Sequence, residues 1–250
     1  MAETQRVRVT SGGKGNSTIS HSRDEGSLSP EYLRPAADLL GEAFKDDPVI
    51  RWMTSSMPDS TRVAYLPTYW YTLLNQALLN DAVLQGANDW SCCAVWMLPG
   101  KQVDNPLTIS PMGLTALLWN IGLGGGKRML WDYGHQADVC KRKGLRDSNG
   151  KVIKRYHYLF VMATDTAHRG KGLASGLLAQ YQEQAAKDGL PIWLEATTAA
   201  SRNIYARCGF ETVQEVRMGK GSHAESGAMY AGGPGVPLWG MIWRPSVDAQ

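Results

Sequence analysis

The chain has 250 residues, of which 43% are hydrophobic and 20% charged, and its formal net charge at pH 7 is only +3. The length is sufficient for one sizeable core, so we expect a single domain over residues 1–250. The small, dispersed charge gives no reason to expect a nucleic-acid partner. No signal-peptide core and no apolar run long enough to span a bilayer is seen, so a cytoplasmic protein without a membrane partner is expected.

The four cysteines give no metal signature. Cys92, Cys93, Cys140 and Cys208 lack the paired spacing of a metal site. Neighbours such as Cys92 and Cys93 point to opposite faces of a strand. We therefore expect no metal and reduced thiols, as in a cytosol.

The first half of the chain alternates strand and helix patterns. The predicted elements are a strand at 6–10, a mobile loop over the Gly- and Ser-rich residues 11–29, a helix from about Pro30 to Phe44, a helix at 63–79, and strands at 83–85 and 94–97. Ser29 and Pro30 are typical of a helix start, since Ser caps and Pro fits the first turn. The strands at 83–85 and 94–97 flank a turn at 86–89.

Residues 107–140 predict two helical segments joined by a glycine-rich connection at 122–128. The Gly-Lys pair in this connection resembles part of a phosphate-binding P-loop. However, residue 121 is Ile, Arg128 follows Lys127, and no strong strand precedes the pair. A flexible helix connection is therefore the interpretation.

The most informative stretch begins with an apolar strand at 156–164, continues through a turn at 165–172, and enters an amphipathic helix. Gly170 and Gly172 allow backbone angles and close ligand approach that a Cβ would block. Arg169 and Lys171 add positive charge beside a helix N-terminus, whose unpaired N–H groups attract anions. The sequence thus predicts a cradle for a phosphate group, although a surface turn that caps a helix is the alternative.

The last third predicts a strand at 191–196, a short helix at 199–207, a strand to about 217, a loop at 219–236, and a final strand at 238–243. Gly209 is a natural C-terminal helix stop. The glycine content of residues 219–236 predicts a flexible loop, since long loops within compact domains are usually functional or disordered.

Two motifs in order resemble the GCN5-related N-acetyltransferases, or GNAT family. The first is Arg169-x-x-Gly172-x-Ala174, and the second is Tyr205-x-x-x-Gly209-Phe210. Residues 40–48 and 94–99 further resemble the branch that includes puromycin N-acetyltransferase, so the resemblance covers about residues 31–217. It implies an α/β fold with a mixed, mainly antiparallel sheet of roughly six to seven strands, flanked by helices and splayed at strands 4 and 5.

The resemblance also implies acetyl-CoA as cosubstrate and assigns its binding residues. Backbone groups of Met162, Ala163 and Thr164 would pair with the pantetheine arm. The pyrophosphate would lie on the turn, whose residues are Arg169, Gly170, Lys171, Gly172, Leu173 and Ala174. Ser201 and Asn203 are further candidates, although helix capping and solvent exposure explain them as well.

Tyr205 is the candidate general acid, because the family's tyrosine before Gly-Phe protonates the departing thiolate; a packing role is the alternative. Glu195 is the candidate general base, because desolvation on an apolar strand raises a carboxyl pKa. A structural salt bridge is its alternative. Tyr158, His157 or a bound water are the other candidate bases.

The resemblance implies direct attack in a ternary complex by a primary amine, expected to belong to a small molecule or xenobiotic. A protein or peptide acetyltransferase and a non-catalytic acyl-CoA-binding module are the alternatives. The loop at 219–236 would lie on the acceptor side, and Asp46 and Asp47 are candidates for binding a cationic acceptor. If the loop does not contact the acceptor, the alternative acceptor-binding residues are Phe44, Asp46, Trp52 and the segment 118–131. The protein is expected to be a monomer or a homodimer.

Overall fold

The computed structural model describes residues 8–12, 16–20, 30–103, 105 and 113–246. The chain forms two compact units. Unit one comprises Met1–Ala43, Ala64–Leu117 and His157–Gln180, and unit two comprises Phe44–Val63, Leu118–Tyr156 and Tyr181–Gln250. Each unit is assembled from segments that are far apart in the sequence, so no single linker separates them. The single-domain expectation stays a prediction.

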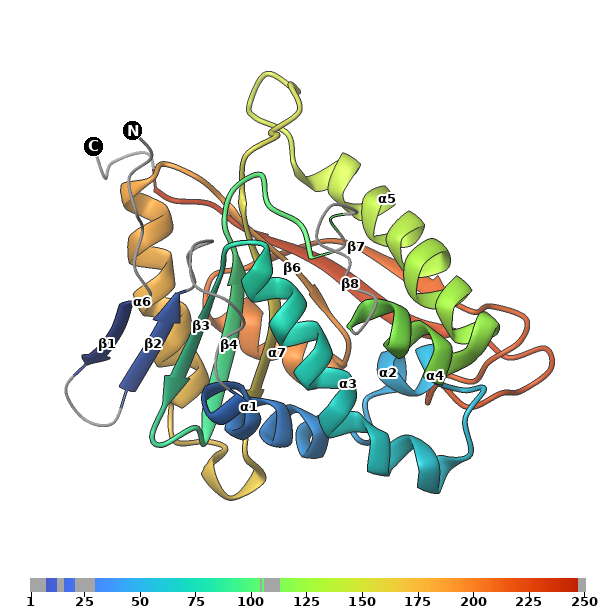
Figure 1. The fold of residues 1–250 in the computed structure, drawn as a ribbon. Coiled ribbons are helices and arrows are strands. Elements are labelled where there is room, and N and C mark those ends of the chain that lie inside the picture. Colours follow the sequence, from blue (N-terminus) through green and yellow to red (C-terminus); the bar gives the residue numbers. More distant parts are fainter. Residues whose placement is uncertain (1–7, 13–15, 21–29, 104, 106–112, 247–250) are drawn as a thin grey trace. The chain divides into compact units, whose positions relative to one another are not determined.

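Unit one is a helix-covered antiparallel sheet. Its strands, in sheet order, are β1 (Arg8–Gly12), β2 (Asn16–Ser20), β3 (Ala82–Ala87), β4 (Cys92–Met97) and β5 (His157–Thr164). Its helices are α1 (Pro30–Ala43), most of α3 (Asp59–Leu79), the short 3₁₀ helix η3 (Thr166–His168) and the first part of α6 (Leu173–Lys187). Figure 1 shows α1 and α3 on the viewer's side of β3 and β4.

Burial explains the pattern of these strands. Every residue of β4 is buried, whereas β5 alternates buried and half-buried positions. Helix α1 packs on β4 and β5 and covers one face. The ladder between β4 and β5 contains a bulge, because Val95 pairs with Val161 while Trp96 pairs with Leu159. Phe160 is therefore the extra residue, and such a bulge bends a strand and increases its twist.

The mobile loop expected at 11–29 is wrong for residues 16–20, which form β2. This strand pairs with β1 on one side and with β3 on the other, where Ile19 lies opposite Leu84. Its polar composition is typical of a loop, but the edge of β3 offers unpaired backbone groups that a further strand can satisfy. Residues 13–15 and 21–29 of the expected loop lie outside the described residues.

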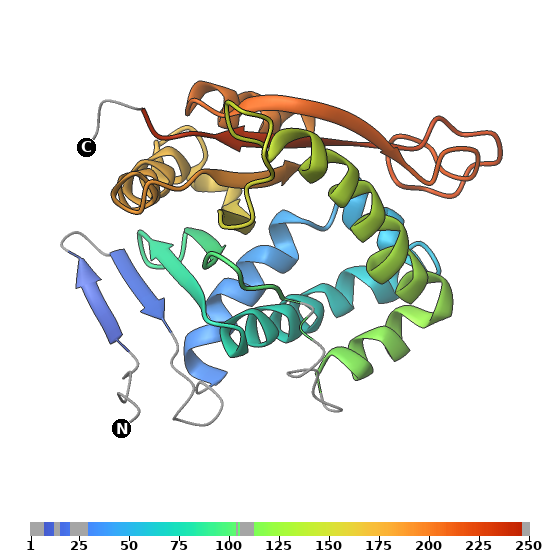
Figure 2. The same ribbon diagram turned by 90° about the horizontal axis from the view of Figure 1, so that it is seen from above.

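Unit two contains a second antiparallel ladder, in which β8 (Val236–Trp243) pairs with both β6 (Ile192–Ala196) and β7 (Glu211–Met218). Its helices are α2 (Pro48–Met53), most of α4 (Leu114–Lys127), the π-helix η2 (Arg128–Tyr133), α5 (Gly134–Gly144), the end of α6, and α7 (Ala199–Arg207). Figure 2 shows α5 over one face of this ladder and α7 over the other. The described strands are mostly antiparallel, and the predicted α/β fold class is confirmed.

Glycines permit the close contact of α5 with this ladder. A Cβ at Gly144 would lie 2.5 Å from the ring of Trp193, and a Cβ at Gly240 would lie 2.6 Å from Cβ of Cys140. Both distances are shorter than packed atoms allow, so the missing side chains let helix and sheet approach over the buried Trp193.

The middle of the chain differs from the expected pair of helices with a flexible connection. Helix α4 continues through residues 123–127 after one non-helical residue, Gly122 (φ 72°, ψ 171°), and η2 and α5 follow directly. Gly122 permits this interruption because a positive φ suits glycine. Helix α2 was not predicted at all. The described residues contain no helix long and apolar enough to cross a membrane.

Candidate functional site

The turn after β5 has the shape that its glycines predict. Gly170 (φ 76°) and Gly172 (φ 78°) both adopt the left-handed backbone region. Apart from the adjacent residues, no atom of the described part of the chain lies within 4 Å of a Cβ placed on Gly170, and at Gly172 the nearest such atom is the Ser175 hydroxyl at 3.8 Å. The space beside both residues is therefore open, and α6 begins at Leu173 with its first N–H groups at this turn. These residues fit an anionic group.

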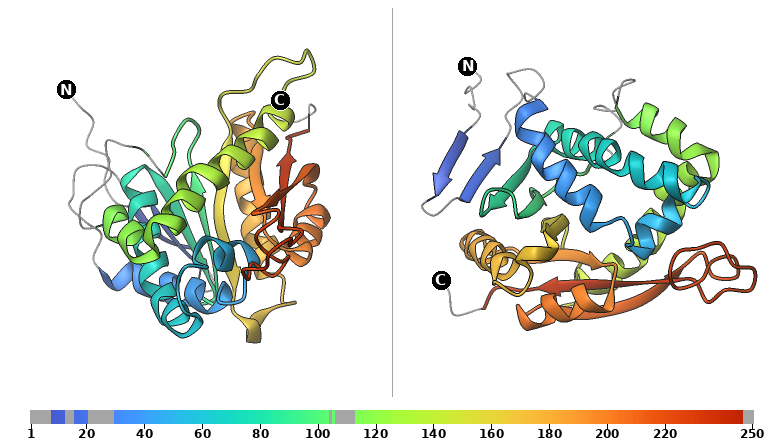
Figure 3. Two further views of the ribbon diagram at one scale, coloured as in Figure 1. Left: turned by 90° about the vertical axis from the view of Figure 1, so that its right-hand side faces the viewer. Right: turned by 90° about the horizontal axis from the view of Figure 1, so that it is seen from below.

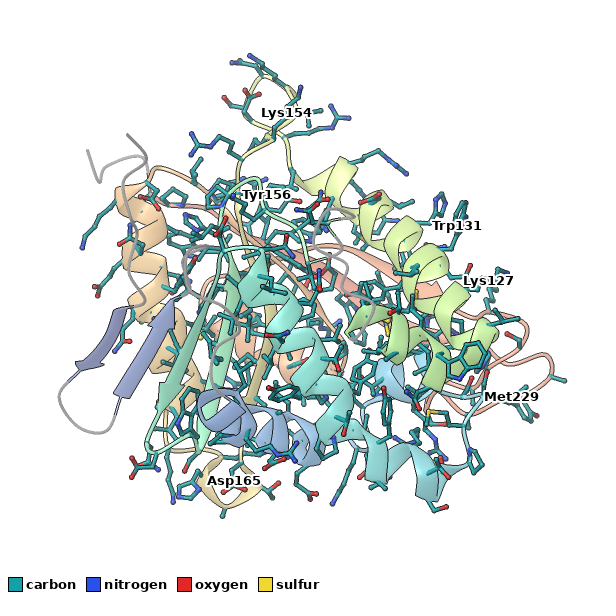
Figure 4. The ribbon with its side chains drawn as sticks, viewed as in Figure 1. Lys127, Trp131, Lys154, Tyr156, Asp165 and Met229 are labelled. Carbon is teal, nitrogen blue, oxygen red and sulfur yellow. The ribbon has the colours of Figure 1, made fainter. Side chains whose placement is uncertain are left out.

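The approach to this turn is stabilised by Asp165, which Figure 4 labels just beyond the end of β5. Its carboxylate pairs with Nδ1 of His168 at 2.7 Å and accepts from the backbone N–H of Ala167 at 3.4 Å. The hydrogen bond to His168 lowers the pKa of Asp165. Asp165 therefore stabilises η3, and Nε of Arg169 donates to the Thr164 carbonyl at 3.3 Å, which ties the turn to the end of β5.

The end of β5 exposes one face more than the other. Met162 and Thr164 are half-buried, whereas Ala163 between them is buried. All three pair with β4, and the Thr164 hydroxyl donates to the Cys92 sulfur at 3.2 Å. Successive residues of an antiparallel strand direct their backbone groups to alternate sides. Some backbone N–H and C=O groups of residues 162–164 therefore point away from β4 and take no part in the ladder with it.

Tyr205 stands near the C-terminal end of α7, where the chain forms a Schellman motif. The Phe210 N–H donates to the Tyr205 carbonyl, and the Gly209 N–H donates to the Ala206 carbonyl, both at 3.0 Å. Gly209 has φ 84°, so the predicted helix stop is confirmed. The rings of Tyr205 and Phe210 lie 5.8 Å apart, which is the apolar contact that accompanies this motif. The phenol ring thus has a packing role irrespective of its hydroxyl.

The other two candidates on α7 differ in their environment. Ser201 forms a capping box with Thr198: its N–H donates to the Thr198 hydroxyl at 3.1 Å, and its own hydroxyl accepts from the Thr198 N–H at 3.2 Å. Asn203 is exposed. The capping alternative for Ser201 therefore has direct support, whereas the side chain of Asn203 is accessible to a ligand.

Glu195 lies on the α5 side of β6. Its side chain is 1% exposed, it accepts from Nε1 of Trp193 at 2.7 Å, and the Lys141 ammonium group lies 3.9 Å away. These contacts support the salt-bridge alternative. A buried carboxylate engaged in this way can accept a proton from a substrate only through a relay.

The other candidate bases lie on opposite faces of β5. His157 is 1% exposed, whereas Tyr158 is half-buried, with its ring 6.4 Å from that of Phe160. Their alternation follows from the two-residue period of a strand. Tyr158 is therefore the more accessible of the two.

A contact that the sequence analysis missed joins Asp47 to Thr197. The Thr197 hydroxyl donates to Oδ2 of Asp47 at 2.5 Å, although 150 positions separate the two residues. Burial raises the pKa of Asp47 above its usual value, an effect that the hydrogen bonds from Thr197, Ile50 and Val49 partly oppose. The Asp-Pro sequence after α1 signals a helix cap, but no local signal identifies a partner this distant. Asp46, in contrast, is exposed.

The glycine-rich loop at 219–235 is packed and internally hydrogen-bonded. Its backbone bonds include Gly221 N–H to Gly233 O at 2.8 Å and Tyr230 N–H to Ser222 O at 2.9 Å. His223 is 5% exposed and lies between the hydroxyls of Ser55 (3.0 Å) and Ser222 (2.9 Å). Figure 3 shows the loop extending from the ends of β7 and β8. The predicted flexibility of this loop stays a prediction.

The alternative acceptor segment at 118–131 carries exposed aromatic side chains. Trp119 is 88% exposed and Trp131 is 75% exposed, and Figure 4 shows Trp131 projecting away from η2. Trp52, in contrast, is buried at 1% exposure. The described residues contain no cluster of three or more potential metal ligands.

The predicted cofactor residues at 162–164 and 169–174 lie in unit one, whereas Tyr205, Glu195, Ser201 and Asn203 lie in unit two. Unit one therefore holds the candidate phosphate-binding turn and the alternative bases His157 and Tyr158, and unit two holds the candidate acid Tyr205 and the candidate base Glu195.

Comparison with known proteins finds several acetyltransferases that are similar to this chain. The Acetyltransferase (GNAT) family model matches residues 144–210. An uncharacterized N-acetyltransferase of Schizosaccharomyces pombe is 24% identical over 225 residues, which cover 88% of this chain and 82% of the relative.

Two solved structures share the fold. One, described as histone acetyltransferase HPA2 and related acetyltransferase from Corynebacterium glutamicum, has a TM-score of 0.53 and 20% identity, covering 89% of this chain and 96% of the other. The second is arylalkylamine N-acetyltransferase 2 of Aedes aegypti, with a TM-score of 0.53, 18% identity, and coverage of 88% and 97%.

The fold, the glycine turn and the family match define an acyltransferase. Residues 144–210 match the GNAT family model, and the relatives of the chain support an acyltransferase that depends on acetyl-CoA.

Proposed function

We propose that the protein acetylates a primary amine of a small molecule, and that the amine attacks the thioester directly in a ternary complex. The observation that carries the donor side is the open turn at Gly170 and Gly172, flanked by Arg169 and Lys171 and followed by the N-terminus of α6. The small-molecule acceptor is supported by the likeness to an arylalkylamine N-acetyltransferase.

Acetyl-CoA supplies a thioester carbonyl that a neutral amine can attack without a covalent enzyme intermediate. The turn residues 169–174 would hold its pyrophosphate, and the backbone of Met162, Ala163 and Thr164 would orient its pantetheine arm. Orientation of two reactants can lower the barrier by about 7 to 11 kcal/mol. Positioning is therefore the largest single contribution we assign to the chain.

Tyr205 is the proposed general acid, which donates its phenolic proton to the sulfur as the thiolate leaves. The contact with Phe210 and the Schellman motif hold the ring in one orientation. Packing of the ring and chemistry of the hydroxyl are thus separable roles, and Tyr205→Phe removes only the second.

The proton lost by the amine has a less direct route. Glu195 is still the proposed base, but it would receive the proton of the amine through an intervening group, because its carboxylate is buried against Trp193 and Lys141. Tyr158, His157 and a bound water remain the alternative bases. A Glu195→Gln variant distinguishes them, because loss of the acidic limb of the pH–rate profile would assign the base to Glu195.

The experiment that tests the proposal is a thiol-release assay with acetyl-CoA across a panel of arylalkylamines, diamines and histone peptides. We expect turnover with a small amine and no greater turnover with any peptide. Tyr205→Phe should lower kcat for that amine by about 10²- to 10⁴-fold with little change in acetyl-CoA affinity. Preferential turnover of peptides would replace the small-molecule acceptor with a protein acceptor. Acetyl-CoA binding without any turnover would indicate a non-catalytic module.

A further inference from the structure

Asp47 uses both oxygens of a buried carboxylate to join two turns of unit two. Oδ1 accepts from the N–H groups of Val49 at 2.9 Å and Ile50 at 3.0 Å, and so caps α2. Oδ2 accepts from the Thr197 hydroxyl at 2.5 Å. Asp47 itself is 7% exposed. The carboxylate is therefore a point of attachment between the start of α2 and the chain after β6.

Helix capping alone does not explain this arrangement. One side-chain oxygen suffices for an N-cap, and a neutral Ser, Thr or Asn serves as well without the cost of burying a charge. The second oxygen of Asp47 contacts a residue that has no part in α2. Because Asp47 is only 7% exposed, its carboxylate is also poorly placed to bind an acceptor amine itself.

Thr197 is the residue directly before the N-cap of α7. Thr198 caps this helix through its capping box with Ser201. None of the described residues of α7, Ala199–Arg207, is buried. A nine-residue helix has little stability of its own. Within the helix, the Arg202 guanidinium lies 5.1 Å from the centroid of the Trp239 ring, and further attachments hold the two ends of α7.

The C-terminal end of α7 is held by the Schellman motif at Gly209 and by Nε2 of Gln182, which donates to the Cys208 carbonyl at 2.8 Å. The N-terminal end is held by Thr198 and, through Thr197, by Asp47. Tyr205 itself takes part in the C-terminal attachment, since its carbonyl accepts from the Phe210 N–H, and the N-terminal attachment fixes the direction of the helix that carries it.

We propose that Asp47 is a positioning residue, which through Thr197 fixes the N-terminal end of α7 and thereby the place of Tyr205. This role rests on the proposed function of Tyr205 as general acid. A displacement of about 1 Å can reduce a rate by about 10²-fold, so the attachment affects kcat more than substrate binding.

The test compares Thr197→Val, which removes the hydroxyl at constant shape, with Thr197→Ser, which keeps it. Thr197→Val should lower kcat at least about tenfold while acceptor KM changes less than about twofold, and Thr197→Ser should restore most of the rate. Thr212→Val, an exposed threonine of β7, is the matched control and should leave kcat unchanged. Asp47→Ser keeps one oxygen to cap α2 but has no second oxygen for Thr197, so it should lower kcat as Thr197→Val does and replaces that variant if it folds poorly.

Two further measurements separate positioning from other roles. In a Tyr205→Phe background, Thr197→Val should reduce kcat much less than in the wild type, since both changes impair one step. An undiminished loss in that background, or an unchanged kcat for Thr197→Val alone, would overturn the proposal. Amide hydrogen exchange across residues 199–207 should accelerate in Thr197→Val and not in Thr212→Val. That readout needs no catalysis, so it distinguishes a failure of the attachment from a failure of the proposed acetyl transfer.

Discussion

Two glycine-rich segments of this chain use glycine for different physical reasons. At Gly170 and Gly172 the backbone angles are left-handed and the space where a Cβ would stand is open. In the loop at 219–235 the same space is open at Gly221 and Gly232 but filled at the other glycines: a Cβ at Gly227 would collide with the Pro48 carbonyl, and a Cβ at Gly233 would collide with the His223 carbonyl. The glycines of the first segment leave space beside the backbone that a ligand can occupy. In the second segment, glycines let other atoms of the protein pack directly against the backbone. Glycine content alone therefore does not indicate mobility.

The largest effect that would test this comparison is expected from Gly227→Ala. The new Cβ meets backbone atoms of α2, and the φ of 81° is unfavourable for any residue with a side chain. We expect a loss of about 3 kcal/mol of stability, which lowers Tm by about 6 to 12 °C. Gly170→Ala has a similar φ of 76° but no nearby atom, so its loss should be about 1 kcal/mol. Thermal denaturation that gives equal losses would contradict the distinction.

The converse variant is Gly172→Asp, which places a side chain and a negative charge in the open turn. Acetyl-CoA at a hundredfold excess over Kd should stabilise the wild type by about 2.7 kcal/mol, and the variant should show no such shift. Gly189→Asp is the matched control, because Gly189 has φ 65° and equally open surroundings at the end of α6. Its shift with acetyl-CoA should persist. A shift that survives in Gly172→Asp would remove the turn from the cofactor site.

Shortening the loop between Gly219 and Gly235 to a tight turn tests its expected acceptor-side role. We expect the acceptor KM to rise about tenfold, equivalent to about 1.4 kcal/mol of binding, while the thermal shift with acetyl-CoA is kept. The control is a shortened hairpin between Arg146 and Val152, which form an isolated bridge in the same unit. An unaltered acceptor profile in the loop variant would show that this loop serves stability only.

The smallest effect concerns His223, which attaches the same loop to Ser55. Burial lowers the pKa of His223, and the positive charge of Arg128 lowers it further. The folded protein therefore binds this proton less readily than the unfolded chain. The stability associated with the neutral imidazole is present above the usual histidine pKa of about 6.5 and is lost as the pH falls below it. His223→Gln should accordingly show a smaller drop in Tm between pH 7.5 and pH 5.5 than the wild type, and an equal drop in both proteins would contradict this role of His223.

Local signals in the sequence predicted much of the backbone geometry at the candidate site. The turn at 165–172 and the helix stop at Gly209 depend on backbone angles that glycine permits within a few residues, and both have the expected geometry. The Tyr205-x-x-x-Gly209-Phe210 motif also has a local physical basis, since its three defined positions are those that a Schellman motif brings together.

Contacts between distant segments were not predictable in the same way. Strand β2 forms because the edge of β3 is available for pairing, whereas the polar residues of β2 give no local signal for a strand. The partner of Asp47 lies 150 positions away, and the surroundings of Glu195 depend on where α5 places Lys141. In the loop at 219–235, glycine signals permissive backbone angles but not which atoms occupy the freed space.

The order of the strands around β8 has a consequence for synthesis of the chain. Strands β6 and β7 both pair with β8, which comes last of the three in sequence. Val236, where β8 begins, follows Ala196, where β6 ends, by 40 residues. At roughly 5 to 20 residues per second, the apolar β6 leaves the ribosome about 2 to 8 s before the strand it pairs with. During that interval Ile192, Trp193 and Leu194 have no partner from β8, which makes the nascent chain a client for chaperones and its premature termination products prone to aggregate.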